Sequence, residues 1–232
     1  MRPIDLDLIV ELYEKYAEPL ADARNAQREL LARFRGPIKA QLDDIEAEIT
    51  YLLVRDTRPE TVVEIGALHG WSASWILRAL VDNGTGHLFS YDLIDSSERT
   101  VPAELAAGRR TFLHGDVKDR WRELESSPDY VFIDAAHSGR FARWYLEHLF
   151  PGLRSGVRVS VHDVFHFRRP VPLSEGAVLM RHLGRHGMPY FTAAPARARQ
   201  TYQRLLELRR DLKLDQPVRK STDNPMVYFT LG

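Results

Sequence analysis

The chain has 232 residues, of which 44% are hydrophobic and 28% are charged, so it is long enough for one α/β domain with a sizeable core. Its 32 basic and 32 acidic residues balance, which argues against binding of nucleic acid or of an anionic membrane through bulk charge. The absence of cysteine excludes disulfides, thiolate metal ligands and a cysteine nucleophile. No signal peptide follows Met1, and no run approaches the roughly 20 apolar residues of a membrane span, so we expect a cytoplasmic protein.

Residues 1–58 are predicted to form an N-terminal helical cap. Apolar residues recur every three or four positions in two stretches, at 8–16 and 38–53, with a break at Gly36–Pro37. The cap either covers one edge of a sheet or provides a lid or a homodimer surface over the active site. Periodicity alone leaves both alternatives open.

From Thr61 onward, short apolar runs alternate with helical patterns. This alternation is typical of right-handed βαβ units and predicts a doubly wound, mostly parallel sheet in a second unit, residues 59–232. The strands are expected at 61–65, 87–91, 111–113, 130–133 and 157–161, and the helices between them at 71–82, 103–107, 118–124 and 139–150.

The C-terminal third begins with an aromatic and basic segment, residues 164–172, which is followed by a helix at 177–186. Strands are expected at 189–193 and 225–231, paired antiparallel at the edge of the sheet. Between them, an Arg-rich helical insertion near 196–213 is most simply a solvated face. Aromatic side chains here suggest a planar or apolar ligand, although core packing explains them equally well: Phe165, Phe167, Tyr190 and Tyr202.

A glycine turn follows the first strand. Gly66 and Gly70 separate the run 61–65 from the next helix, and a strand, a glycine turn and a helix N-terminus together cradle a ligand closely. Glu64, just before the first glycine, would gain nothing in a site built for phosphate alone. A cationic ligand group explains this acid better.

Polar residues end the other predicted strands, where ligands bind in doubly wound sheets. Asp92 is placed to accept hydrogen bonds from both ribose hydroxyls of a nucleoside, unless it is only a turn or capping residue. Gly115 and Asp116 end the third strand, and the oxygen of Asp116 suits an adenine amine. The fourth and fifth strands end at Asp134 and at His162–Asp163.

Taken together, these motifs resemble the class I S-adenosylmethionine-dependent methyltransferases. The resemblance spans about residues 40–165 and includes Glu-Ile-Gly-Ala-Leu-His-Gly-Trp-Ser at 64–72, whose G-x-x-x-G differs from the G-x-G-x-x-G of dinucleotide dehydrogenases. It implies a seven-stranded Rossmann-like methyltransferase fold and S-adenosylmethionine as the cofactor. The implied cofactor-binding residues are Glu64, Gly66, Ala67, His69, Gly70 and Ser72 around the amino-acid end, Asp92 and Leu93 at the ribose, Gly115, Asp116 and Val117 at the adenine, and Asp134.

Within that class, the chain resembles small-molecule O-methyltransferases of the catechol type, and more closely the macrocin O-methyltransferase and cephalosporin-hydroxylase-like group. In those relatives, acidic residues that end the fourth and fifth strands bind a divalent metal. The resemblance assigns a site for Mg²⁺ or Mn²⁺ to Asp134, His162 and Asp163. His162 departs from the relatives, which carry an oxygen ligand there, and imidazole favours Mn²⁺, Fe²⁺ or Zn²⁺ over Mg²⁺. Alternatively, Asp134 touches the cofactor and the His-Asp pair acts without metal.

His137 is the candidate base for the reaction. A hydroxyl becomes a good nucleophile when a histidine removes its proton or a metal lowers its pKa, and we expect Asp134, His137 and His162 to be catalytic. The predicted function is O-methylation of a small hydroxylated acceptor, natural-product or sugar-like, without nucleic-acid or membrane partners. The alternatives are metal-free N- or macromolecule methylation, and a nucleoside-cofactor-binding protein that transfers no methyl group.

Overall fold

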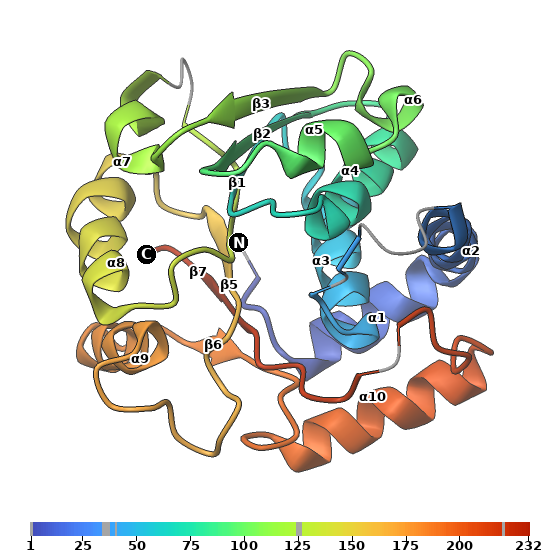
Figure 1. The fold of residues 1–232 in the computed structure, drawn as a ribbon. Coiled ribbons are helices and arrows are strands. Elements are labelled where there is room, and N and C mark those ends of the chain that lie inside the picture. Colours follow the sequence, from blue (N-terminus) through green and yellow to red (C-terminus); the bar gives the residue numbers. More distant parts are fainter. Residues whose placement is uncertain (1, 34–37, 40, 124–126, 220) are drawn as a thin grey trace.

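The computed structural model describes residues 2–33, 38–39, 41–123, 127–219 and 221–232, so the break predicted at Gly36–Pro37 lies outside the described residues. A seven-stranded sheet with the strand order β3-β2-β1-β4-β5-β7-β6 forms its centre (Figure 1). The strands are β1 (Thr61–Ile65), β2 (His87–Asp92), β3 (Arg110–His114), β4 (Tyr130–Ile133), β5 (Arg158–Val161), β6 (Tyr190–Phe191) and β7 (Val227–Thr230).

The sheet is doubly wound. Strands β1 to β5 pair in parallel, whereas β7 runs antiparallel to both β5 and β6. The chain moves outward from β1 through β2 to β3 and then returns to β4 on the other side of β1. This reversal opens a crevice beyond the carboxyl ends of β1 and β4. The predicted fold class and the antiparallel pairing at the edge are both confirmed.

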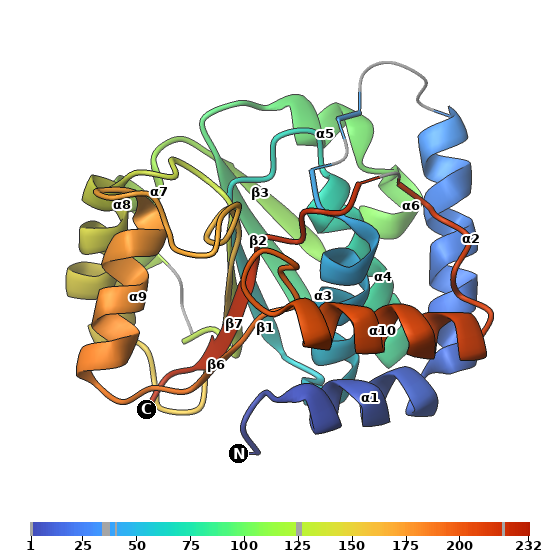
Figure 2. The same cartoon turned by 90° about the horizontal axis from the view of Figure 1, so that it is seen from below.

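Helices cover both faces of the sheet (Figure 2). Alternate strand residues point to opposite faces, so Val62 packs in the core beneath α3 and α4, while Val63 packs beneath α8 and α9. One layer holds α1 (Leu6–Lys15), α2 (Ala17–Arg33), α3 (Asp44–Thr57), α4 (Trp71–Asn83), α5 (Ser96–Thr100), α6 (Ala103–Ala106) and α10 (Arg199–Asp211). The other holds α7 (Val117–Arg120), α8 (Gly139–Trp144), the short π-helix Tyr145–Leu149 and α9 (Glu175–Arg185), with short 3₁₀ helices at Trp121–Glu123 and Phe150–Gly152.

The N-terminal region differs from the prediction in detail. The periodicity predicts one helix over 38–53, but α3 begins only at Asp44, because a capping box formed by Asp43 and Glu46 sets the N-terminus of the helix there. The Asp43 backbone N–H donates to Glu46 Oε2 at 3.0 Å. Ile38 and Leu42 therefore precede the helix, and Leu42 is buried at a bend just before it. Helix α5 was not predicted, since its five residues carry no apolar periodicity.

The three N-terminal helices share one hydrophobic core with the sheet. Leu12 of α1, Leu20 of α2 and Ile49 of α3 are buried in the same cluster as Val62 and α4. The cap thus covers one face of the sheet and not, as the simpler alternative had it, an edge, and the homodimer surface stays a prediction. Within the described ranges, no helix combines the length and apolarity needed to cross a membrane.

A buried ionic network ties this layer together. Glu48 of α3 is fully buried and forms ion pairs with Arg24 of α2 and Arg209 of α10, and the Tyr13 hydroxyl donates to it at 2.7 Å. Asp44 contacts both arginines as well. Burial lowers the pKa of Arg24 to about 10, as expected for a cation removed from water.

Replacing Glu48 by glutamine should destabilise the protein strongly. Two guanidinium groups would stay buried with Asp44 as their remaining shared carboxylate, and breaking such buried ion pairs costs about 3–5 kcal/mol in the free energy of unfolding. Denaturant unfolding measures this change. Glu207→Gln is the matched control, since Glu207 pairs with Arg204 on the surface of α10 at 3.8 Å and should contribute only about 0–1 kcal/mol. Equal effects of the two variants would contradict the structural role of the network.

Candidate functional site

The glycine turn packs directly against the end of β4. Gly66 has φ of +90°, and a Cβ at this position would overlap the carbonyl group of Asp134. The Gly66 backbone N–H donates to the Tyr91 carbonyl at 2.8 Å. Only glycine permits this backbone conformation together with so close an approach, so the turn is fixed between β2 and β4 at the crevice.

Asp92 holds the same turn from the end of β2. Its Oδ2 accepts hydrogen bonds from the backbone N–H groups of Ala67 and Leu68, each at 2.7 Å, and its Oδ1 accepts one from Ile94 at 2.9 Å. An ionised carboxylate offers about four lone-pair sites, so Oδ1 retains acceptor capacity. Asp92 therefore positions the turn and still presents an oxygen to the crevice.

Glu64 lies on the other side of β1 from the place predicted for it. It shares the sheet face of Val62, is fully buried, and accepts hydrogen bonds from Ser72 Oγ and Ser90 Oγ at 2.6 Å each. Burial raises the pKa of Glu64, an effect that Arg110 and the two serines oppose. Glu64 thus ties α4 to β1 and β2 beneath the turn. This is a correction to the expectation that its carboxylate faces a cationic ligand.

One large cavity, of about 610 Å³, lies beyond the carboxyl ends of the strands. It extends from the glycine turn and the β2 and β3 ends to the residues that follow β4 and β5. Seven of the twelve predicted cofactor residues line it: Gly66, Asp92, Leu93, Gly115, Asp116, Val117 and Asp134.

The remaining cofactor residues lie around or behind the turn. Ala67, His69 and Ser72 line a small cavity next to it, of about 10 Å³. Gly70 caps α4 in a left-handed conformation with φ of +77°. Neither Gly70 nor Glu64 lines the two cavities. Of the residues predicted for the adenine, Asp116 caps α7 by accepting from the Lys118 N–H at 3.0 Å, and Val117 is buried.

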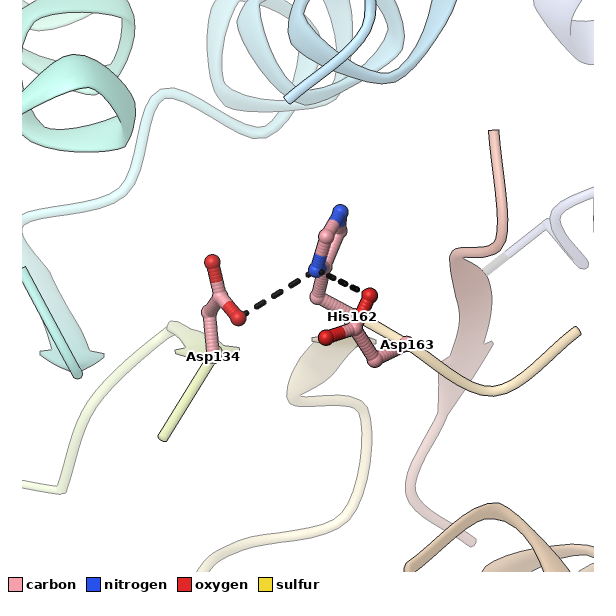
Figure 3. Close-up of side chains that lie close together, drawn as sticks. All are labelled: Asp134, His162 and Asp163. Atoms are coloured by element: carbon pink, nitrogen blue, oxygen red, sulfur yellow. Dashed lines mark ion pairs between the residues drawn. The ribbon is translucent and has the colours of Figure 1, made fainter. Parts of the chain in front are cut away.

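Asp134, His162 and Asp163 converge at the far end of the large cavity (Figure 3). His162 Nδ1 lies 3.2 Å from Asp134 Oδ1 and 3.0 Å from Asp163 Oδ1. Burial alone would lower the pKa of His162, but the charges of Asp134 and Glu46 raise it well above its ordinary value. Burial would raise the pKa of Asp163, but the hydrogen bond and the charge of His162 help to hold it far below its usual range.

His137 stands beside this cluster and is more exposed than His162. Its Nε2 lies 3.3 Å from Asp163 Oδ2 and 3.6 Å from Asp134 Oδ1, and its Nδ1 lies 3.6 Å from Glu175 Oε2. Hydrogen bonding to Glu175 raises the pKa of His137, against burial, and the charges of Asp163 and Asp134 add to the rise. His137 and Asp163 both adopt a left-handed backbone, with φ of 44° and 56°, which is uncommon outside glycine and typical of functional sites.

The prediction missed three members of the cluster. Glu46 Oε2 lies 3.3 Å from His162 Nε2, and His166 Nε2 lies 2.9 Å from Asp163 Oδ1. Glu175, at the start of α9, is the third. None of them ends a parallel strand, and Glu46 and Glu175 occupy first-turn positions of helices, where acids are common for capping alone. Only the tertiary fold brings them to the site.

A further part of the lining comes from the segments that precede α3 and β7. Gln41, Arg219, Ser221 and Asp223 line it, so it is polar. The aromatic residues that were candidates for contact with a planar or apolar ligand do not line the cavity. Phe165 and Tyr202 are buried in the core, and Phe167 is exposed away from the lining. Core packing was therefore the better of the two explanations for Phe165 and Tyr202.

Comparison with known proteins agrees with this geometry. Residues 63–164, from β1 to just beyond β5, match a protein family described as a methyltransferase domain. No curated protein matches the chain. Over this range, the predicted resemblance to methyltransferases is confirmed.

Solved structures of low sequence identity share the fold over nearly the whole chain. The O-methyltransferase TomG from Streptomyces achromogenes, in complex with SAM and involved in tomaymycin synthesis, has a TM-score of 0.57 at 19% identity, covering 93% of this chain and 90% of that chain. An O-methyltransferase from Bacillus cereus in complex with SAH has a TM-score of 0.59 at 13% identity, covering 98% and 100%. The SAH-bound methyltransferase PaMTH1 from Podospora anserina has a TM-score of 0.55 at 17% identity, covering 90% and 87%.

Gly66→Ala should destabilise the protein more than Gly84→Ala. Both glycines have positive φ, so each substitution carries a backbone penalty of about 1–2 kcal/mol. A Cβ at Gly84 meets nothing within 4 Å, whereas one at Gly66 overlaps the Asp134 carbonyl. Overpacking adds about 1–3 kcal/mol. Denaturant unfolding of both variants measures the difference, and an equal loss would show that the turn can move away from β4 freely.

Proposed function

With a methyltransferase domain at residues 63–164, we propose that the protein transfers a methyl group from S-adenosylmethionine to a hydroxyl of a small, polar acceptor. The observation that carries this proposal is the continuity of the large cavity. It joins the glycine turn to a cluster of two aspartates and a histidine at the ends of β4 and β5. A cofactor and an acceptor can therefore meet inside one cavity.

The cofactor would occupy the end of the cavity next to β1, β2 and β3. Gly66 allows the ligand to approach the backbone closely, and Asp92 Oδ1 has an acceptor site left for a ribose hydroxyl. Val117 supplies an apolar wall and Asp116 a carboxylate at the β3 end. Asp134 lies next to the turn and so adjoins both the cofactor end and the acceptor end.

Methyl transfer is an in-line displacement. The sulfur–methyl bond breaks as the oxygen–methyl bond forms, the positive charge of the sulfonium is lost, and the acceptor hydroxyl loses its proton. His137 Nε2 stands at the cluster and would accept this proton, with Glu175 on its Nδ1 side holding the ring. The polar wall of Gln41, Ser221 and Asp223 suits a hydroxylated acceptor, such as a sugar-like group, better than a flat apolar one.

A divalent metal fits the donor set at the cluster. Asp134, His162 and Asp163 each offer one ligand atom, and these atoms lie within 4.8 Å of one another. Both ring nitrogens of the buried His162 lack a hydrogen bond of good geometry, and Nδ1 is the one that lies between the two aspartates, where a metal would bind. A bound metal would lower the pKa of the acceptor hydroxyl and fix its position.

S-Adenosylhomocysteine should bind the protein, and Asp92→Ala should weaken this binding by about 10- to 100-fold. The substitution removes the acceptor proposed for a ribose hydroxyl, and one hydrogen bond to a charged group contributes about 1.5–3 kcal/mol, which is this loss of affinity; it also removes the two hydrogen bonds that hold the turn. Calorimetric titration measures the affinity. Asp211→Ala, on the exposed end of α10, is the matched control. A wild-type protein that does not bind this ligand would contradict the proposed function.

His137→Gln should lower kcat by about 10²- to 10⁴-fold, the usual contribution of a general base, while the affinity for S-adenosylhomocysteine stays unchanged. Steady-state assays on a panel of hydroxylated acceptors, including sugars, measure this split. His182→Gln on α9 serves as the control, because His182 lies outside the cavity lining. An unchanged kcat in His137→Gln would remove His137 from the mechanism.

A further inference from the structure

We propose that His162 binds the metal through Nδ1 while the buried carboxylate of Glu46 holds its Nε2–H, and that this donor set selects a transition metal over Mg²⁺. The proposal rests on the proposed function only for the use of the metal in methyl transfer. The binding preference follows from the residues of this chain and can be tested without an acceptor.

The distances at Nδ1 suit a shared metal. Neighbouring ligand atoms of an octahedral ion with bonds of about 2.1 Å lie about 3 Å apart, by simple geometry. His162 Nδ1 lies 3.2 Å from the nearest oxygen of Asp134 and 3.0 Å from that of Asp163. Despite these short separations, Nδ1 makes no hydrogen bond of good geometry with either carboxylate. Ligand atoms that lie this close together without hydrogen bonds between them are typical of a site that binds a cation.

Glu46 supplies the outer partner that a metal-binding histidine needs. It is buried, and its oxygens are fixed by the backbone N–H groups of Met226 at 2.9 Å and Asp43 at 3.0 Å. Its Oε2 lies 3.3 Å from His162 Nε2. A histidine ligand almost always donates its second ring N–H to such a carboxylate, which fixes the tautomer and leaves the other nitrogen free for the metal.

The chemistry of the donors sets the preference. Mg²⁺ takes oxygen ligands almost exclusively and gives up its water shell reluctantly, whereas imidazole suits Mn²⁺, Fe²⁺, Co²⁺ and Zn²⁺. In this site one of the three protein ligands is a nitrogen, and burial keeps His162 at 6% exposure, so a Mg²⁺-bound water cannot readily replace it. The site should therefore discriminate against Mg²⁺ more strongly than a site of oxygen ligands alone.

Any test must distinguish metal binding by His162 from metal binding by other histidines. His182 and His186 lie one helical turn apart on α9, with ring centroids 4.4 Å apart, and such a pair can bind transition metals adventitiously. His137 and His166 both contact Asp163 and could add a nitrogen ligand. The background for the experiment is thus the full chain with His182→Ala and His186→Ala.

In this background, Mn²⁺, Co²⁺ and Mg²⁺ should be titrated separately by calorimetry, and the Mn²⁺ complex examined by pulsed electron paramagnetic resonance. We expect one site per chain and a nitrogen coupling in the Mn²⁺ spectrum that persists when His137→Gln and His166→Gln are combined in one variant. His162→Asp, which restores an oxygen donor, should shift the Mn²⁺-to-Mg²⁺ affinity ratio toward Mg²⁺ on the order of tenfold. Glu46→Gln should weaken Mn²⁺ binding by about 10- to 100-fold.

Three outcomes would overturn the proposal: no metal binding, a Mn²⁺ complex without nitrogen coupling, or a Mn²⁺-to-Mg²⁺ ratio that is the same with His162→Asp. The spectrum of the variant that combines His137→Gln and His166→Gln decides the case even if His162→Asp does not fold. Binding of S-adenosylhomocysteine by the same preparation keeps the two proposals apart. A protein that binds this ligand but no metal retains the proposed methyltransferase function and loses only the metal inference.

Discussion

The carboxylates at the N-terminus of α3 are the constraint on which most of the cavity depends. Asp44 accepts the backbone N–H groups of Val218 and Arg219 at 2.9 and 2.8 Å, and Glu46 accepts that of Met226. These bonds fasten the segment before β7 over the crevice, where it forms the polar wall of the cavity. Because such a segment has no ladder of its own, its buried backbone donors require side-chain acceptors. The helix that looks like an accessory cap thus builds part of the site.

Acidic side chains also hold protein groups in place around the glycine turn. Glu64 and Asp92 are both acids next to the turn, and both use their oxygens to hold protein groups: the hydroxyls of Ser72 and Ser90 in one case, the backbone of the turn in the other. They differ in the face they occupy. Glu64 lies under α4, whereas Asp92 lines the cavity. An acid in a ligand-binding motif can therefore act on the ligand indirectly, by making a strained turn rigid.

Sequence alone predicted the parallel sheet, because buried strands and their intervening helices have distinct periods, and it located the strand ends where Asp92, Asp134 and Asp163 meet the cavity. It could not place Glu64 correctly, because a strand buried on both faces gives no alternation to show which way a side chain points. It also could not find Glu46 or Glu175. Their distances in sequence from His162 and His137 carry no signal, and contacts between helices and strand ends arise only from tertiary packing.

The contact between Glu46 and His162 connects the N-terminal helix α3 to the end of strand β5. Glu46 takes part in the capping box of α3, anchors the segment before β7, and faces the imidazole at the end of β5. Its burial raises its pKa, and the charge of His162 offsets this cost, so each group makes the ionised form of the other less unfavourable. A carboxylate buried for three such purposes cannot be replaced by an apolar residue without loosening the cap, the cavity wall and the candidate ligand together. The end of the cavity near Asp134 and His162 is in this sense built by the N-terminal region as much as by the sheet.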